Sequence, residues 1–275
     1  MKSKAKAITA YTVTRFIIQA IFFLFLPALF SSAFTGVRYI AERIFEHEVV
    51  GLNHFIITLI ILLSFTILFG RFFCGYACAF GSLGDWLFAF FSFVGIRIKI
   101  SGRVLHLLQY GKYIVLIVIL AACFTGRYSM LAKVDPWTLF SLLRAGNFNL
   151  TGQLPAAILF LLILIGMCFF ERFFCQFLCP MGAILALLPV LPFTVFDREK
   201  ENCIEGCSLC VRTCPAAISL GEGRSKYGDC FQCGKCSAKC PKANIRTCFG
   251  KFRGIESVPV LGKAILLFVV CYYFL

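Results

Sequence analysis

Half of the sixteen cysteines in this 275-residue chain stand in two closely spaced runs near its C-terminal end. Each run holds four cysteines and closes on a proline, with the spacings Cys203-x3-Cys207-x2-Cys210-x3-Cys214-Pro215 and Cys230-x2-Cys233-x2-Cys236-x3-Cys240-Pro241. The second run has the spacing of bacterial iron–sulfur sites, in which three thiolates hold one 4Fe-4S cubane and the fourth ligates its neighbour. The expected ligand sets are therefore crossed. The first cluster takes Cys203, Cys207, Cys210 and Cys240, and the second takes Cys230, Cys233, Cys236 and Cys214.

The first run departs from this pattern by one residue inserted between Cys203 and Cys207. The insertion lengthens the first binding loop and can alter the potential of the first cluster. Zinc is the main alternative, because paired cysteines also build tetrahedral zinc sites. Zinc does not need two runs of four cysteines that each end in proline, and pairs this dense are poor candidates for disulfides in a reducing compartment. The runs therefore predict two 4Fe-4S clusters.

A second group of four cysteines lies in a duplicated segment. The eight residues from Arg71 to Cys78, RFFCGYAC, recur 101 positions later from Arg172 to Cys179 as RFFCQFLC. In a helical turn the two cysteines of each copy stand at i and i+4, with Cβ atoms about 5–6 Å apart. The two pairs together supply four ligands, each pair preceded by an arginine that can offset an anionic site. We therefore expect a third redox site at Cys74, Cys78, Cys175 and Cys179.

An iron–sulfur cluster or another redox metal is the favoured occupant of this third site, and a reversible dithiol is the main competitor. A buried cysteine by itself is more often a small apolar residue than a ligand. That interpretation suits Cys123, Cys168 and Cys271. Cys248, just after the second cysteine run, is interpreted as a spare thiol.

The composition predicts that a membrane domain positions these motifs. Hydrophobic residues make up 60% of the chain, charged residues only 15%, and the mean hydropathy is +0.88. An ordinary soluble domain carries about 25% charged residues. The chain is therefore too apolar to be a soluble domain.

Four runs have the length of a spanning helix, about 20 residues. Three of them, 16–37, 49–70 and 145–170, carry no charge. The fourth, 104–126, is interrupted only by His106 and Lys112 near one end, where a lysine can extend to the lipid headgroups. The first run is longer than the apolar core of about 7–15 residues in a secretory signal, so we expect a retained anchor.

Three further apolar segments are too short or too interrupted for a simple span. Asp85 divides segment 79–96 and two prolines divide segment 181–196, so both are expected to be re-entrant or interfacial half-helices. Segment 264–275 is expected either to span or to lie in the interface. The predicted fold is an α-helical membrane protein of 4 to 5 transmembrane helices plus two half-helices, with internal duplication and a small α+β domain of the two-cluster, bacterial-ferredoxin type.

The charge distribution predicts how the chain is oriented. Lysine and arginine number 27 against 13 acidic residues, a formal charge of +14, which in a membrane protein indicates anionic headgroups rather than nucleic acid. With a cytoplasmic N-terminus, the inner segments before the second motif hold nine basic residues and the outer loops five. We therefore expect a multi-pass protein of the inner (cytoplasmic) membrane with the cysteine runs in the cytoplasm.

Side chains for group-transfer chemistry are missing from the sequence. The three histidines, His47, His54 and His106, do not follow a C-x-x-C and form no pair suited to haem in the spans. The chain also lacks a glycine-rich phosphate loop, a catalytic triad and an H-E-x-x-H motif. The predicted substrate is therefore electrons, and the chain is expected to be an electron-transfer component of an oxidoreductase complex rather than a stand-alone enzyme.

The chain resembles the membrane polyferredoxin family that includes NapH, NosR and CcoG. The resemblance rests on two C-x3-C motifs among apolar segments, followed by the two cysteine runs, and covers nearly the whole chain. The second motif carries the family's proline at Pro180, whereas Cys78 is followed by Ala79. The sequence holds no counterpart of the extracytoplasmic flavin domain of the NosR branch, so the shorter NapH-like branch is the nearer one. The expected domains are a membrane domain at 1–196, a cytoplasmic two-cluster ferredoxin domain at 197–258, and a C-terminal transmembrane or interfacial helix at 259–275.

For the NapH-like branch the resemblance implies electron transfer between the quinone pool or a soluble donor and a separate reductase system. The expected partners are thus the membrane, other subunits of a redox complex, a quinone and an acidic soluble electron carrier. The basic segment 224–253 suits either docking of that carrier or contact with headgroups.

The competing function is an assembly factor of the CcoG kind, in which the same centres reduce a metal ion for delivery to another enzyme. It predicts soft metal ligands on the outer face. The outer loops contain no cysteine, and their only histidine and methionine are His47 and Met130. Electron relay is therefore favoured.

Overall fold

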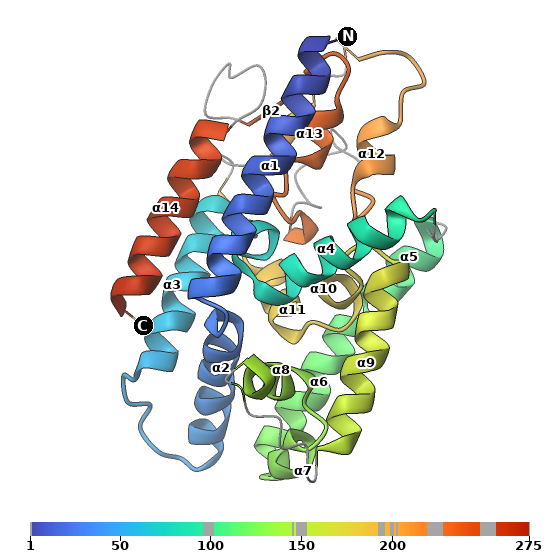
Figure 1. Cartoon of the computed structure of the whole chain (residues 1–275). Helices are drawn as coiled ribbons and strands as arrows, with labels where there is room; N and C mark the ends of the chain where they lie inside the picture. The colour runs from blue at the N-terminus through green and yellow to red at the C-terminus, as the bar shows by residue number, and fades with distance from the viewer. Residues whose placement is uncertain are drawn as a thin grey trace.

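The computed structural model describes residues 2–95, 102–144, 146, 153–191, 196–198, 201, 203–218, 228–247 and 257–274. This part of the chain is mainly helical, with the helices α12 (Leu209–Thr213) and α13 (Lys235–Lys239) of the cysteine-run region at one end (Figure 1). Two short strands, β1 (Phe196–Arg198) and β2 (Ile245–Thr247), pair antiparallel with Phe196 opposite Thr247. The strands close the cysteine-run region around a small core.

The first predicted span is bent. Helices α1 (Lys2–Phe25) and α2 (Leu29–Phe45) are separated by a short break at Pro27, and their apolar parts meet at 59°. Proline lacks the amide proton that continues a helix, and its ring clashes with the preceding turn. The uninterrupted helix predicted for 16–37 is therefore wrong.

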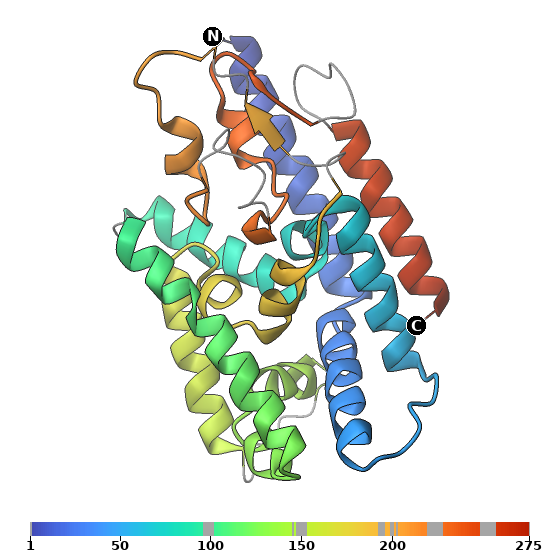
Figure 2. The same ribbon diagram turned by 180° about the vertical axis from the view of Figure 1, so that it is seen from behind.

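Each copy of the duplicated segment forms an apolar helix, a short turn that holds the first cysteine, and a second helix that starts after the second cysteine. In the first copy these are α3 (His54–Phe69), η1 (Phe73–Ala77) and α4 (Ala79–Phe93), and in the second they are α9 (Leu154–Phe169), α10 (Phe173–Phe177) and α11 (Pro180–Leu187). Helices α3 and α9 approach their motifs from the same end of the molecule (Figures 1 and 2). The repeat is therefore parallel, and both motifs lie on one side of these helices.

Asp85 does not divide α4. The helix runs unbroken from Ala79 to Phe93, and Asp85 is only 8% exposed because Arg15 and Arg172 pair with its carboxylate. The prediction that Asp85 breaks segment 79–96 is therefore wrong within the described part of that segment. In the second copy, α11 does end before Pro189, as expected for a residue that cannot continue a helix.

One helix in the described ranges has by itself the length and hydropathy of a membrane span. It runs from Val104 to Phe124 and combines α5 (Gly102–Gln109) with α6 (Gly111–Phe124). The bent pair α1 and α2 passes the same test only as one unit, and the other apolar helices are shorter. The C-terminal segment forms α14 (Ser257–Phe274), which lies along α3 in both views (Figures 1 and 2).

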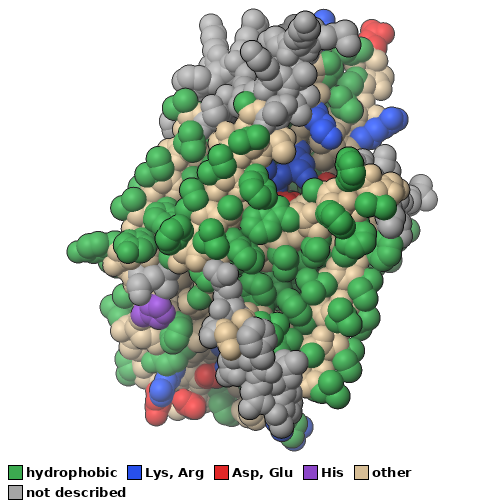
Figure 3. Space-filling model, in the orientation of Figure 1, with side chains coloured by type: hydrophobic (Ala, Val, Ile, Leu, Met, Phe, Trp, Pro, Cys, Tyr) green, Lys and Arg blue, Asp and Glu red, His purple; other side chains and the backbone are tan. Residues whose placement is uncertain are grey.

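Apolar side chains cover much of the outer surface. Figure 3 shows hydrophobic side chains over most of one face, with Lys and Arg side chains in its upper half, some of them in a hollow, and charged groups at its lower end. Large apolar residues are half exposed or more on separate helices, among them Phe16, Ile117, Leu161 and Ile265. Soluble monomers rarely expose apolar surface on this scale. The surface is therefore suited to lipid contact.

At the end away from the cysteine runs, α7 (Tyr128–Ala132) and α8 (Pro136–Arg144) enclose Asp135. The hydroxyls of Tyr128 and Thr138 donate to its Oδ2 atom at 2.9 and 3.0 Å. Burial, only partly offset by these hydrogen bonds, raises the pKa of Asp135 to about 6. The folded protein therefore holds this proton at pH values where the unfolded chain has released it.

This difference predicts that stability falls as the pH rises from about 4 to 6, by up to about 1.4 kcal/mol per pH unit from this group. Asp135→Asn should remove this part of the pH dependence, because an amide does not titrate. Unfolding of the detergent-solubilised wild type and variant across pH 4–7 measures the difference. Parallel pH profiles for the two proteins would show that Asp135 is not the titrating group.

Candidate metal centres

The four cysteines of the duplicated motifs meet in the interior. Their side chains are between 5% and 7% exposed, and none forms a disulfide. Burial, followed by the nearby thiols of Cys175, Cys74 and Cys78, raises the pKa of Cys179. The structure thus brings together four thiols from two distant segments of the chain, which is the set that the sequence predicted.

The two cysteines of a motif do not share one regular helical turn. Cys74 lies in the π-helical turn η1, whereas Cys78 has extended backbone angles (φ −72°, ψ 122°) and precedes α4. Cys179 adopts nearly the same angles (φ −75°, ψ 109°) before α11. The predicted i, i+4 geometry is therefore wrong. Pro180 explains the conformation of Cys179, because a residue before proline avoids the α region, and Cys78 adopts it without a proline.

The extended conformation puts the second thiol of each motif at a helix N-terminus. In the second motif the Sγ atom of Cys179 accepts a hydrogen bond from the backbone N–H of Gly182 at 3.1 Å. The positive end of a helix dipole favours negative charge at this position. Both features stabilise a thiolate.

Arg172 connects the two copies of the repeat. It is 1% exposed and donates to the backbone carbonyls of Cys74 and Gly75, the latter at 3.0 Å. The same guanidinium binds Asp85 through Nε at 3.1 Å and Nη2 at 2.6 Å. The arginine that precedes one cysteine pair thus binds the backbone of the other pair.

Arg71 occupies the equivalent position in the first copy and is also 1% exposed. Its Nη2 lies where a side chain on Gly182 would be, 2.9 Å from the position of a Cβ atom there. Neither Nε nor Nη2 makes a hydrogen bond of good geometry, and the thiols of Cys74 and Cys179 are among its charged neighbours. Arg71 therefore lies beside cysteines of both motifs.

The surroundings of the four thiols carry more positive than negative charge. Four buried cations, Arg15, Arg71, Lys112 and Arg172, face the carboxylates of Asp85 and Asp229. Lys112 does not extend to the headgroups as predicted, since it is 2% exposed and pairs with Asp229. A cluster held by four thiolates is an anion that would balance this charge.

The second cysteine run forms a compact thiol group with one member of the first run. Burial, followed by the thiols of Cys233, Cys230 and Cys214, raises the pKa of Cys236. Burial also raises the pKa of Cys230 to about 12 and of Cys214 to about 11. These four residues are the crossed set predicted for the second cluster.

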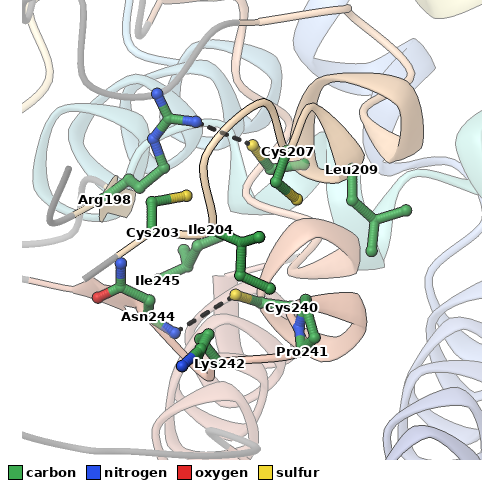
Figure 4. A pocket seen from close by; sticks show the side chains of 11 residues that line it. Arg198, Cys203, Ile204, Cys207, Leu209, Cys240, Pro241, Lys242, Asn244 and Ile245 are labelled. Carbon is green, nitrogen blue, oxygen red and sulfur yellow. Dashed lines mark hydrogen bonds between the residues drawn. The ribbon is translucent and has the colours of Figure 1, made fainter. Parts of the chain in front are cut away.

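The other four cysteines of the runs line one pocket, drawn in Figure 4 with Arg198 and Asn244 at its edge. The backbone N–H of Asn244 donates to the Sγ atom of Cys240 at 3.4 Å, and Arg198 donates to the Sγ atom of Cys210 at 3.7 Å. N–H donors to the sulfurs are one of the means by which proteins adjust cluster potentials. The pocket is lined by Cys203, Cys207, Cys210 and Cys240, the set predicted for the first cluster. Cys248 lies outside the described residues.

In the described ranges, no group of three or more His, Cys, Asp or Glu side chains surrounds one point closely enough to hold a single metal ion.

Comparison with known proteins adds an independent finding. A family model described as a 4Fe-4S binding domain matches residues 54–98 and 153–192, and each range contains one motif of the repeat. A protein of Methanocaldococcus jannaschii is 26% identical over 84% of this chain and 92% of its own length. NirI of Paracoccus denitrificans is 34% identical over 60% of this chain and 24% of NirI. The ferredoxin-type protein NapH of Haemophilus influenzae is 27% identical over 66% of this chain and 63% of NapH.

NosR of Pseudomonas aeruginosa is 31% identical over 24% of this chain and 73% of that relative's length, and the chain belongs to the membrane polyferredoxin family. This membership supports an iron–sulfur electron-transfer role for the polyferredoxin. No solved structure matches the chain.

Several residues that surround the four motif thiols of this polyferredoxin carry little signal in the sequence. Asp85 and Lys112 were interpreted as a helix break and a headgroup contact, although an ionisable residue in an apolar run is itself a signal of a buried functional site. Arg15 and Asp229 gave no such signal, because their partners lie far away in the sequence. Only the folded chain identifies them.

The buried ion pairs generate a stability prediction for the polyferredoxin. Asp85→Asn leaves Arg15 and Arg172 without their carboxylate, which should cost about 3–5 kcal/mol of unfolding free energy. Glu46 pairs with Arg43, but the Glu46 side chain is 53% exposed. Glu46→Gln should therefore lower the free energy of unfolding by less than about 1 kcal/mol. Denaturant unfolding of both variants in detergent measures the contrast. Similar losses in the two variants would contradict the assigned role of Asp85.

Proposed function

We propose that the protein is a membrane-bound electron-transfer subunit that relays single electrons between a cytoplasmic or quinone donor and a partner redox complex. The observation that carries this proposal is the meeting of four buried thiols, two from each copy of the repeat, inside a shell with excess positive charge. Such a shell suits a centre whose negative charge increases when it gains an electron.

We further propose three iron–sulfur centres. The crossed sets predicted from the two runs would hold two 4Fe-4S clusters, and the membrane-edge thiols of Cys74, Cys78, Cys175 and Cys179 would hold a third centre. The match of the 4Fe-4S binding model to both copies of the repeat supports iron–sulfur rather than a reversible dithiol at the third site. The guanidinium of Arg71 beside two of its thiols supports the same choice.

The bound clusters would supply one-electron oxidation and reduction. The residues of the chain would exclude water from the clusters and stabilise their charge. Burial of the four membrane-edge thiols excludes water, and Arg71 and Arg172 stabilise negative charge next to them. Asn244 and Arg198 donate to sulfurs at the first cluster site. Ion pairs with Asp229 and Asp85 hold Arg71 and Arg172 in place, so these two residues would rearrange little during electron transfer.

The proposed topology places the ferredoxin domain, residues 197–258, in the cytoplasm and the rest in a multi-pass arrangement in the inner membrane. Lys239 and Lys242 are exposed and flank Cys240, a proposed ligand of the first cluster. An acidic soluble carrier could dock there through complementary charge. Lys235 is not part of this surface, because it pairs with Glu171.

The ligand assignment predicts a shared loss of iron. Cys74→Ser and Cys179→Ser should each remove the same iron and the same spectroscopic species, because either change leaves the third site incomplete. The double variant should lose no more than either single one. Iron and acid-labile sulfide analysis with EPR during reductive titration provides the measurement.

Cys123→Ser is the matched control, since Cys123 is 1% exposed but belongs to none of the proposed ligand sets. Its iron content should equal that of the wild type, and Cys233→Ser should lose the second cluster. Unchanged iron and spectra in both motif variants would mean that the four cysteines only pack the repeat. Zinc without labile sulfide in anaerobic protein would contradict the cluster assignment altogether.

The topology predicts the labelling of introduced cysteines. Probes at Glu46, which follows α2, and at Gly146, which follows α8, should react with an impermeant thiol reagent from outside the cell only, because α2 and α8 lie in the half of the molecule away from α12 and α13 (Figure 1). The endogenous Cys168 serves as the background control in the parent protein. A probe at Lys242 that reacts from outside would reverse the proposed orientation.

A further inference from the structure

Phe231 occupies the space between the two arginines of the repeat. It stands between Cys230 and Cys233 in the second cysteine run, and its ring is 4.8 Å from the guanidinium carbon of Arg71 and 5.1 Å from that of Arg172. Cations over an aromatic face are attracted to it, more strongly when they are desolvated. Phe231 is 4% exposed. The ferredoxin domain thus inserts one side chain at the junction of both motifs.

The backbone next to Phe231 lies directly on the first motif. A Cβ atom on Gly75, between Cys74 and Cys78, would collide with the carbonyl oxygen of Phe231 and lie 3.6 Å from the Cα atom of Cys233. Gly75 is therefore needed for this close approach. Cys233 is a proposed ligand of the second cluster and Cys74 a proposed ligand of the third site. Only these two backbone segments, which are in contact, separate them.

Polar contacts hold the same segment on both sides of Phe231. Asp229 pairs with Lys112 and lies 3.6 Å from Arg71. On the other side, the hydroxyls of Tyr11 and Tyr76 donate to the carbonyl oxygen of Cys233, the latter at 3.3 Å. The contact is thus fixed from α1, η1 and α6.

The first cluster site faces a different environment. Cys210 and Cys240 of the first set pack, together with Cys230 and Cys236 of the second set, against the small core of Phe196 and Ile245 on the two strands. Cys214, Cys230 and Cys233 pack against the main core that contains the motif cysteines, and all three belong to the second set. The two cluster sites of the ferredoxin domain are therefore not equivalent toward the membrane domain.

We propose that the second cluster site is the contact of the ferredoxin domain with the membrane-edge site, and that Phe231 and Gly75 set the separation of the two. The proposal rests on the proposed function and deepens it, because it gives the order of the centres. A single electron passes between these neighbouring sites. With centres bound, one would be oxidised and the other reduced without any bond formed or broken, and the set of Cys203, Cys207, Cys210 and Cys240 would hold the cluster that exchanges electrons with the soluble or protein partner. Phe231 is a positioning residue in this scheme.

Magnetic coupling between reduced centres tests the order. Wild-type protein reduced by dithionite should show EPR splitting between the second cluster and the third centre. Gly75→Ala should abolish or weaken this splitting with full iron content, because the new Cβ atom forces the two segments apart. Gly262→Ala is the matched control, since a Cβ atom there meets nothing within 4 Å, and its spectrum should not change.

Two further variants keep the test decisive if Gly75→Ala loses iron. Phe231→Leu keeps an apolar side chain but loses the ring between the arginines, and it should weaken the same splitting. Cys203→Ser should remove the first cluster and leave the splitting intact. Splitting that survives Gly75→Ala and Phe231→Leu, or that disappears only in Cys203→Ser, would overturn the inference while leaving the three centres in place. Wild-type protein with only two clusters would instead contradict the proposed function as well.

Discussion

The ion pairs of Asp85 hold the membrane-edge site together. Arg15 reaches this carboxylate from α1 at 2.5 Å and Arg172 from the second copy of the repeat at 2.6 Å. Unpaired charges in such a buried position would cost several kcal/mol each, so the three segments are held in one arrangement. With its remaining donors Arg172 binds the backbone around Cys74. The positions of the first motif therefore depend on a residue of the second.

The two arginines of the repeat, Arg71 and Arg172, have different partners, so the two sides of the thiol site differ. Arg172 donates to Asp85 and to backbone carbonyls, whereas Arg71 lies beside the thiols of Cys74 and Cys179 and pairs with Asp229. Both arginines contact Phe231, but only Arg71 adds an ion pair with the cysteine-run region around it. A sequence repeat thus yields one site with two different sides.

The lengths of the helices constrain where the thiols can lie in a membrane. Helices α3 and α9 have 16 residues each and so extend about 24 Å. This is less than the hydrocarbon thickness of about 30 Å. In the proposed topology, the motifs at the ends of these helices would lie near the membrane border on the side of the cysteine runs. A centre there is within reach of both that domain and the membrane interior.

The sequence by itself determined the cysteine sets, the apolar helices and the duplication, because ligand spacing, hydropathy and repetition are local properties of the chain. It also located the end of α11 through Pro189. Only the tertiary structure decided that Asp85 and Lys112 are buried in ion pairs, and that Phe231 lies between two arginines. It also decided that Cys78 is extended without a following proline. These features depend on partners as far apart as Lys112 and Asp229. Charge pairing in a dry interior is decided by which segments meet, and residue spacing along the chain does not contain that information.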